Sequence, residues 1–176
     1  VSNRGPVGFV ADEDGGLRAQ RSGGGLVTAL TGLIDIVPAV WISAAIENGD
    51  FQVAHEADGD FPIEGAGVST RGRFVVMDAE VYDRYYNVVS NPMLWFIQHY
   101  LWDLSNVPDI REQELAAWDD GYLVANELFA DAVVEELGTN PDAVVMLHDY
   151  HLYTAPASIR ARAPEAFLHF FVHIPW

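Results

Sequence analysis

Ionisable side chains directly follow a short apolar run near the end of the sequence. Residues 144–147, Val-Val-Met-Leu, lead into His-Asp-Tyr-His at 148–151. Four apolar residues, two of them valine, predict a buried strand of a parallel sheet. A second apolar run, 167–172, is followed in the same way by His173. Because ligands of open α/β sheets bind outside the carboxyl ends of the strands, we expect a polar site at this sheet edge.

Residue chemistry leaves several roles open at this edge. Asp149 could cap the next helix, or it could accept hydrogen bonds from sugar hydroxyls. His148 and His151 have the spacing of two metal ligands. However, the sequence has no HExxH motif and no second compact group of ligands, so we expect no metal and a structural role for at least one of them. His173 could be a core histidine bonded to backbone, but its place after a strand favours a functional role.

A glycine run indicates a candidate phosphate site. Residues 23–25 are all glycine and precede a predicted helix. Glycine allows close backbone approach, and a helix N-terminus presents free N–H groups to an anion. The run matches neither the GxGxxG dinucleotide pattern nor a P-loop, so a simple turn is the alternative. Arg4, after a predicted strand end at the same edge, could bind that phosphate or be an ordinary surface residue.

Three aromatic residues admit two interpretations. Trp41, Tyr86 and Trp95 could belong to the core, as most aromatic side chains on helices do. A flat ring with one polar group is also what a sugar-binding site uses. From chemistry alone, the sequence therefore predicts an α/β domain with a polar, aromatic cleft and an anion-binding loop.

Composition excludes several classes of function. The formal net charge of −17 argues against binding to nucleic acid or to an anionic membrane. All nine basic residues are arginine, so any phosphate must be held by guanidinium groups or backbone amides. The absence of cysteine excludes disulfides and thiolate metal sites. No signal peptide and no apolar run of ~20 residues occurs, which makes a cytoplasmic location the default expectation.

The periodicity predicts alternating strands and helices. We expect a turn at 12–16 and a hairpin or exposed loop over 47–72. The expected strands are 40–44, 73–77, 144–147 and 167–172. The expected helices are 26–37, a helical stretch over 79–104, a long helix over 110–137 with Gly138 as its cap, and 154–162.

This alternation predicts a doubly wound, mostly parallel, Rossmann-like sheet in one domain over residues 1–176. The chain starts near a strand end and stops just after one. We therefore expect a fragment of a longer enzyme, truncated at both ends.

Six motifs, in order, resemble the N-terminal half of the trehalose-6-phosphate synthase family, which are retaining glycosyltransferases of the two-domain GT-B type. The resemblance covers essentially all 176 residues. The motifs are Ser2-Asn3-Arg4, Gly24-Gly25, Tyr85-Tyr86-Asn87 through Leu94-Trp95, Trp118-Asp119-Asp120-Gly121-Tyr122, His148-Asp149-Tyr150-His151-Leu152 and His173-Ile174-Pro175.

The resemblance implies transfer of glucose from a nucleotide-glucose, usually UDP-glucose, to glucose 6-phosphate, with no metal and no other cofactor. It implies a front-face reaction in which the leaving diphosphate helps to deprotonate the acceptor, with His173 and Asp149 as catalytic residues. By the same resemblance, the acceptor is bound by Arg4, Trp41, Tyr86, Trp95 and Asp149, and the donor by Gly24, Gly25 and His173.

Two departures from the family pattern leave the acceptor open. Trp41 is followed by Ile-Ser-Ala rather than a glycine-rich stretch, and Trp176 stands where phenylalanine is common. The alternatives are a synthase or pseudo-glycosyltransferase with another acceptor, or a non-catalytic sugar-phosphate-binding domain. A hydrolase that uses Asp149 ranks low, because it lacks a nucleophile. The donor base and a homo-oligomeric state stay open. The family's nucleotide-binding C-terminal domain is not among these residues, so we expect the fragment alone to be inactive.

Overall fold

The structure is a computed structural model that describes residues 1–11, 16–34, 36–56, 60–63, 70–101 and 110–174. The chain divides into two compact units, Val1–Val76 and Met77–Trp176, and each is described by itself. Among the described residues, no helix is both long enough and apolar enough to cross a membrane.

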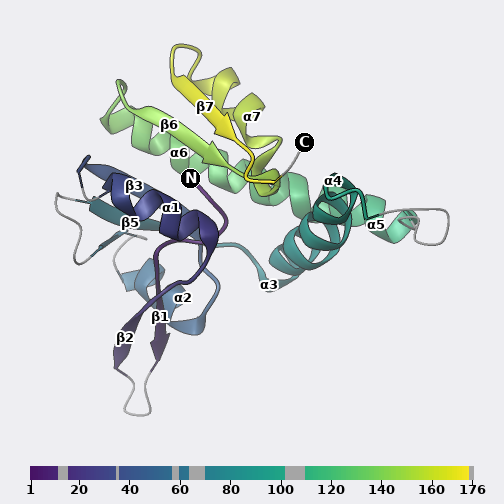
Figure 1. Cartoon of the computed structure of the whole chain (residues 1–176), viewed down its shortest axis with the longest axis horizontal. Coiled ribbons are helices and arrows are strands. Elements are labelled where there is room, and N and C mark those ends of the chain that lie inside the picture. The colour runs from purple at the N-terminus through teal and green to yellow at the C-terminus, as the bar shows by residue number, and fades with distance from the viewer. Residues whose placement is uncertain (12–15, 35, 57–59, 64–69, 102–109, 175–176) are drawn as a thin grey trace. The chain divides into compact units, whose positions relative to one another are not determined.

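The first unit contains a hairpin and a mixed three-stranded sheet (Figure 1). The hairpin pairs β1 (Val7–Ala11) with antiparallel β2 (Leu17–Arg21). In the sheet, β5 (Thr70–Val75) lies between parallel β3 (Ala39–Ala44) and antiparallel β4 (Asp60–Pro62). Its helices are α1 (Gly25–Ile34) and α2 (Asn48–Glu56).

Three phenylalanine rings organise the core of this unit. Phe61 stacks on Phe74 with ring centroids 4.4 Å apart, and Phe9 meets Phe61 edge-on at 5.2 Å. Gly72 lies beneath the Phe61 ring, where an added Cβ would come within 2.1 Å of a ring carbon. The buried Asp50 carboxylate accepts hydrogen bonds from the backbone N–H groups of Phe9, Ile46 and Glu47, which ties the hairpin to the start of α2.

The second unit begins with helices and ends with a parallel strand pair. One helical stretch contains α3 (Ala79–Tyr82), the π-helix η1 (Asp83–Trp95) and α4 (Phe96–Gln98). Another contains α5 (Glu112–Ala117), the π-helix η2 (Trp118–Leu123) and α6 (Val124–Thr139). The chain continues through β6 (Val144–His148), the short 3₁₀ helix η3 (Tyr150–Leu152), α7 (Ala155–Arg162) and β7 (Phe167–Phe171). Figure 1 shows β6 and β7 side by side, with α6 and α7 alongside the pair.

A glycine allows the two π-helices of this unit to pack closely. Gly121 of η2 is buried against η1, and an added Cβ would lie 2.4 Å from the Cβ of Arg84 and 2.9 Å from the backbone nitrogen of Tyr85. Beside this contact, Tyr85, Tyr122 and Phe129 are fully buried. The helices therefore meet through backbone and aromatic rings, and Tyr122 of η2 donates a hydrogen bond to the Tyr150 carbonyl just after β6.

The predicted α/β class is confirmed, and most predicted elements occur within a few residues of their expected limits. Over 47–72 the expected hairpin is present in part, because β4 pairs with β5 in the antiparallel sense. Residues 48–56 instead form the helix α2, in which Asp50 is buried and Gln52, His55 and Glu56 are exposed. Gly138 is not a cap, since α6 continues to Thr139 and is capped at Asn140. The predicted turn at 12–16 lies almost wholly outside the described residues, as do Pro175 and Trp176.

Candidate functional site

Asp149 occupies an unusual backbone conformation directly after β6. Its φ is 74° and its ψ is 165°, a region that side-chain-bearing residues rarely adopt. The backbone is held there because the Asp149 N–H donates to the Phe171 carbonyl at 2.8 Å and the Asp149 carbonyl accepts from Leu152. Such a conformation costs about 1–3 kcal/mol and persists where the surroundings enforce it, as at binding and catalytic sites.

The Asp149 carboxylate connects the ends of the two parallel strands. Its Oδ1 accepts the backbone N–H of His173 at 3.0 Å, while no side-chain capping bond is made to η3. The helix-cap role that sequence chemistry left open is therefore not what this carboxylate does. Asp149 and His173, which are both expected at the site, therefore lie together.

His148 pairs with His173 at the same place. His148 Nδ1 lies 3.1 Å from His173 Nε2, and His148 is 4% exposed while the His173 side chain is exposed. Burial is the largest of the causes that lower the pKa of His148 to about 4. His148 is therefore neutral near pH 7 and can share one proton with its partner without charge repulsion.

A buried polar network holds the loop that follows Asp149. The Tyr122 hydroxyl donates to the Tyr150 carbonyl at 2.6 Å and accepts the Tyr153 N–H at 3.0 Å. Burial raises the pKa of Tyr122, so the hydroxyl keeps the proton that it donates. Asn126 donates to the His151 carbonyl and accepts from the N–H groups of Thr154 and Ala155.

Residues of the π-helix η1 contact this loop. The Tyr150 hydroxyl donates to the Asn91 side chain at 3.1 Å. Tyr86, expected to bind the acceptor phosphate, stacks on His151 with ring centroids 5.6 Å apart and planes 11° apart. His151 thus orients an aromatic residue of the expected acceptor site, which fits the structural role expected for one of the two loop histidines.

Trp95 ends η1 and is 39% exposed. Its ring lies 4.2 Å from that of His99, and its carbonyl contacts His99 Nδ1 at 2.7 Å. The indole is therefore open to a ligand, whereas Tyr86 is more buried.

Arg4 and Trp41 are linked through Ser2 in the first unit. Trp41 is 5% exposed, and its indole N–H donates to the Ser2 hydroxyl at 2.8 Å. That hydroxyl donates in turn to the Arg4 carbonyl at 2.7 Å. The Arg4 side chain is exposed. Trp41 therefore lies in the core with its one polar group engaged, and its expected contact with the acceptor sugar stays a prediction.

Gly24 and Gly25 precede and begin α1. Gly24 has a φ of +145°, a conformation that favours glycine, and its carbonyl accepts both the N–H and the hydroxyl of Thr28. Added Cβ atoms at Gly24 and Gly25 would meet nothing within 4 Å. The backbone at this helix start is therefore accessible, as the donor-diphosphate prediction requires.

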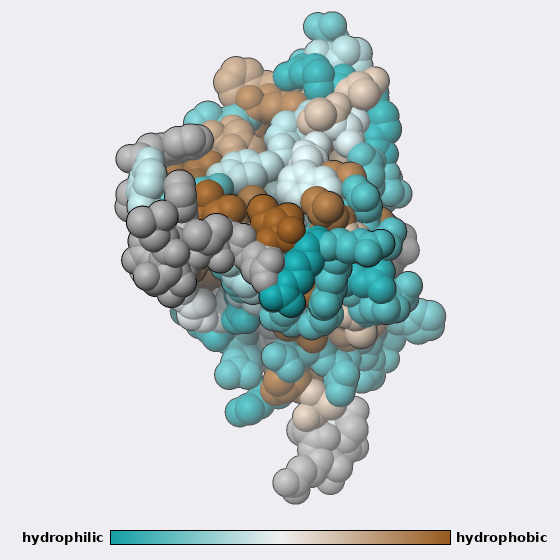
Figure 2. Space-filling view, turned by 90° about the vertical axis from the view of Figure 1, so that its right-hand side faces the viewer, coloured by the Kyte–Doolittle hydropathy of each residue, from teal (hydrophilic) through white to brown (hydrophobic). Residues whose placement is uncertain are grey.

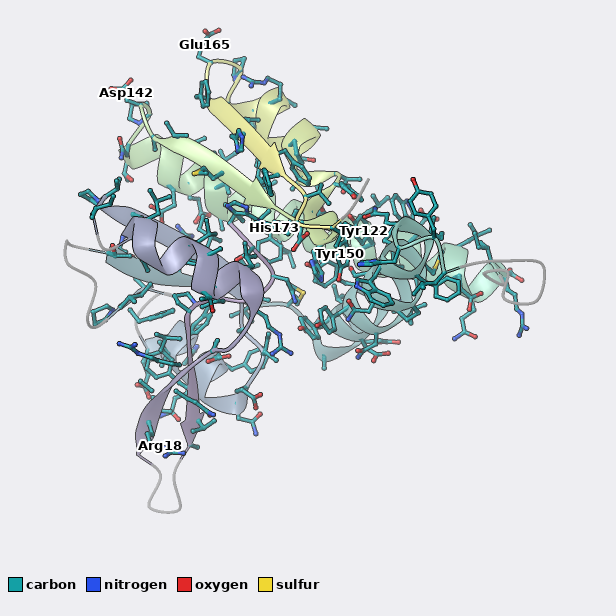
Figure 3. The ribbon with its side chains drawn as sticks, viewed as in Figure 1. Arg18, Tyr122, Asp142, Tyr150, Glu165 and His173 are labelled. Carbon is teal, nitrogen blue, oxygen red and sulfur yellow. The ribbon has the colours of Figure 1, made fainter. Side chains whose placement is uncertain are left out.

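Sequence reasoning missed several residues that build the site. Figure 3 shows Tyr122, Tyr150 and His173 at the carboxyl ends of β6 and β7, whereas Asp142 and Glu165 lie at the opposite ends. The motif at 118–122 was noted without a role; it supplies Gly121 for helix contact and Tyr122 for the loop. Asn126 carried no signal in sequence, because a single asparagine in a helix has no distinctive spacing.

The described residues contain no group of three or more histidine, aspartate or glutamate side chains arranged to hold a metal ion. The chemistry available at these strand ends is hydrogen bonding by one carboxylate and one exposed imidazole, next to stacked aromatic rings. Such a set can orient hydroxyl groups of a sugar.

Parallel strand pairs occur in both units, and polar residues follow β6 and β7. The chain has the Rossmann-like fold of the N-terminal domain of GT-B glycosyltransferases. The chain belongs to glycosyltransferase family 20, whose family model matches residues 1–176.

Individual relatives agree with this family. The alpha,alpha-trehalose-phosphate synthase [UDP-forming] A of Dictyostelium discoideum is 33% identical over all of this chain, which covers 22% of that protein. The validamine 7-phosphate valienyltransferase of Streptomyces hygroscopicus subsp. jinggangensis is 29% identical over 87% of this chain and 30% of that protein. The solved E. coli trehalose-6-phosphate protein bound with UDP-2-fluoro glucose is 28% identical, with a TM-score of 0.65 over 90% of this chain and 32% of that one. The chain thus spans about a fifth to a third of their lengths.

Proposed function

We propose that the full-length protein transfers glucose from a nucleotide-glucose, UDP-glucose in the first instance, to glucose 6-phosphate, with retention. The observation that carries this proposal is the junction of Asp149 and His173 at the ends of two adjacent parallel strands in a member of glycosyltransferase family 20. A UDP-forming synthase among the relatives, and a solved neighbour bound with UDP-2-fluoro glucose, support the choice of donor.

In this proposal, the bond from glucose C1 to the diphosphate oxygen breaks and a bond from C1 to the acceptor O1 forms. The acceptor hydroxyl proton passes to the leaving diphosphate, so no protein nucleophile is needed. Asp149 accepts hydrogen bonds from the acceptor sugar, and His173 contacts the donor sugar near the reacting carbon. Both residues act as preorganised groups, because their positions are set before substrate binds.

Arg4 binds the acceptor phosphate in this proposal, with Tyr86 and Trp95 on the acceptor side and the Gly24-Gly25 backbone near the donor diphosphate. Its support is an exposed guanidinium whose backbone is fixed by the Ser2 hydroxyl. Arginine suits a phosphate dianion because it presents paired N–H donors.

Replacing Arg4 tests this assignment. Arg4→Ala removes a charged hydrogen bond worth about 1.5–3 kcal/mol, so we expect the KM for glucose 6-phosphate to rise about 10- to 100-fold. The assay uses full-length protein with UDP-, GDP- and ADP-glucose and measures nucleoside diphosphate release. Arg18→Ala is the matched control, because Arg18 is an exposed arginine on β2 (Figure 3). An Arg4→Ala enzyme with unchanged KM and kcat would show that Arg4 does not bind the acceptor.

A second candidate is a related transferase with another phosphorylated acceptor. The similarity to a validamine 7-phosphate valienyltransferase favours it over unrelated activities. Alternative acceptors in the same assay decide between the two, and absence of turnover with every donor would favour a non-catalytic sugar-phosphate-binding role.

We further propose that residues 1–176 form the acceptor-side domain and do not turn over UDP-glucose alone, because the relatives are about three to five times longer. Turnover by the isolated 176 residues would contradict this. A cytoplasmic location is also proposed, and cell fractionation tests it. Light scattering on the full-length protein tests for a homo-oligomer.

A further inference from the structure

His148 is a buried histidine to which the proposed reaction assigns no role. It ends β6, and its ring lies against that of His173 with centroids 5.2 Å apart. The contact joins His148 Nδ1 to His173 Nε2 at 3.1 Å, the distance of an N–H···N hydrogen bond. One of these nitrogens must donate and the other must accept, since two bare lone pairs or two N–H groups would repel.

This contact constrains the exposed imidazole. With Nε2 of His173 engaged by His148, only Nδ1 of His173 is left to face a ligand. The direction of this hydrogen bond decides which nitrogen of His173 carries the proton, Nδ1 if His148 donates and Nε2 if His148 accepts. A neutral histidine partner, as the low pKa of His148 requires, can fill this role without placing a positive charge beside His173.

The backbone of His173 is fixed separately. Its N–H donates to Asp149 Oδ1 at 3.0 Å. The main chain and the ring of His173 therefore have different supports, Asp149 for the first and His148 for the second. Loss of either support frees a different part of the residue.

We propose that His148 is a positioning residue that holds the His173 ring through Nε2 and fixes its tautomer, so that Nδ1 of His173 is the atom that meets the donor sugar. The part of this inference that concerns the sugar rests on the proposed function. The part that concerns the tautomer does not.

Two variants of His148 separate positioning from packing. His148→Asn places an amide near the position of Nδ1 and can bond His173, whereas His148→Leu fills similar space and cannot. We expect His148→Leu to lower kcat about 10- to 100-fold with a smaller change in acceptor KM, and His148→Asn to recover most of that loss. Thermal unfolding of both variants shows how much of the loss follows stability. Equal activities of the two variants at equal stability would overturn the proposal.

A readout without turnover keeps the tautomer test independent of the reaction. In full-length protein labelled with ¹⁵N-histidine, ring nitrogen shifts tell a protonated nitrogen from a bare one. The His173 signal is assigned by its loss in a His173→Gln variant. We expect one tautomer of His173 in the wild type and in His148→Asn, and a mixture of tautomers in His148→Leu. The same mixture in the wild type would overturn the proposal. A wild type with one tautomer but no glucosyl transfer would refute only the proposed function.

Discussion

The two units present their candidate binding groups in different ways. In the first unit, the candidate groups are an exposed guanidinium, Arg4, and open backbone at Gly24 and Gly25. In the second unit, Asp149 and His173 are held by bonds from β7, His148 and the loop itself. The first set supplies charge and accessible amides, while the second supplies fixed geometry.

This difference between the two units indicates which binding groups need a fixed position before the ligand binds. A phosphate is recognised by charge and by N–H groups, which tolerate small displacements. Hydroxyl groups near a reacting carbon need donors and acceptors placed within about 0.5 Å, which requires a supporting layer of buried bonds. Figure 2 shows one face, on which hydrophobic residues gather near the middle and hydrophilic residues lie around them. The supporting bonds and contacts lie beneath the surface, at Tyr122, Asn126 and Gly121.

The largest effect is expected from closing the space at Gly121. In Gly121→Ala, the new Cβ would meet Arg84 and the Tyr85 backbone at 2.4–2.9 Å, and backbone cannot give way as a flexible side chain can. We expect a loss of about 3 kcal/mol in unfolding free energy, together with reduced kcat, because η2 carries Tyr122. Denaturant unfolding and the glucosyl-transfer assay measure the two effects.

Gly138→Ala is the matched control for this substitution. Gly138 lies inside α6, and an added Cβ there meets nothing within 4 Å. Alanine should therefore stabilise that helix by up to about 1 kcal/mol. Equal effects of the two substitutions would mean that the η1–η2 contact does not support the second unit.

A smaller loss is expected from Tyr122→Phe. The variant removes the hydroxyl that bonds the Tyr150 carbonyl and the Tyr153 N–H, and it leaves both in a buried region. We expect about 2 kcal/mol of destabilisation and a fall in kcat that exceeds any change in the KM for glucose 6-phosphate. Tyr100→Phe is the control, because Tyr100 is 73% exposed. An unchanged kcat in Tyr122→Phe would show that the buried hydrogen-bond network does not help to position Asp149 and His173.

Sequence alone predicted the strand-end position of the site because two apolar runs were each followed by histidine. It could not predict that Asp149 would bond His173 rather than cap a helix, since that bond joins residues 24 positions apart and depends on β6–β7 register. The helix α2, which lies where the sequence predicted a hairpin or exposed loop, was missed for a related reason. Asp50 looks like a solvated acid in sequence, but in the fold it is buried and accepts three backbone N–H groups.

The roles of Tyr122 and Gly121 show the same limit. Their motif was visible, but only the packing of η2 on η1 shows that the glycine permits contact and the tyrosine holds a loop. For Trp41, the sequence left a core role and a sugar contact open. The fold buries its ring and engages its N–H with Ser2, and the sugar contact stays a prediction.

The smallest effect is a pH dependence of stability that originates in the second unit. Burial is the largest of the causes that lower the pKa of His148 from 6.5 to about 4 in the folded state. Between these values the unfolded state binds more protons, so the unfolding free energy falls as the pH drops, by about 1 kcal/mol between pH 6.5 and 5.5. Unfolding of wild type and His148→Asn across this window measures the contribution as a difference in slope, with exposed His55→Asn as the control. Identical slopes in wild type and His148→Asn would mean that His148 is protonated as easily in the folded protein as in the unfolded one. The fixed geometry of the second unit would then not depend on a neutral His148.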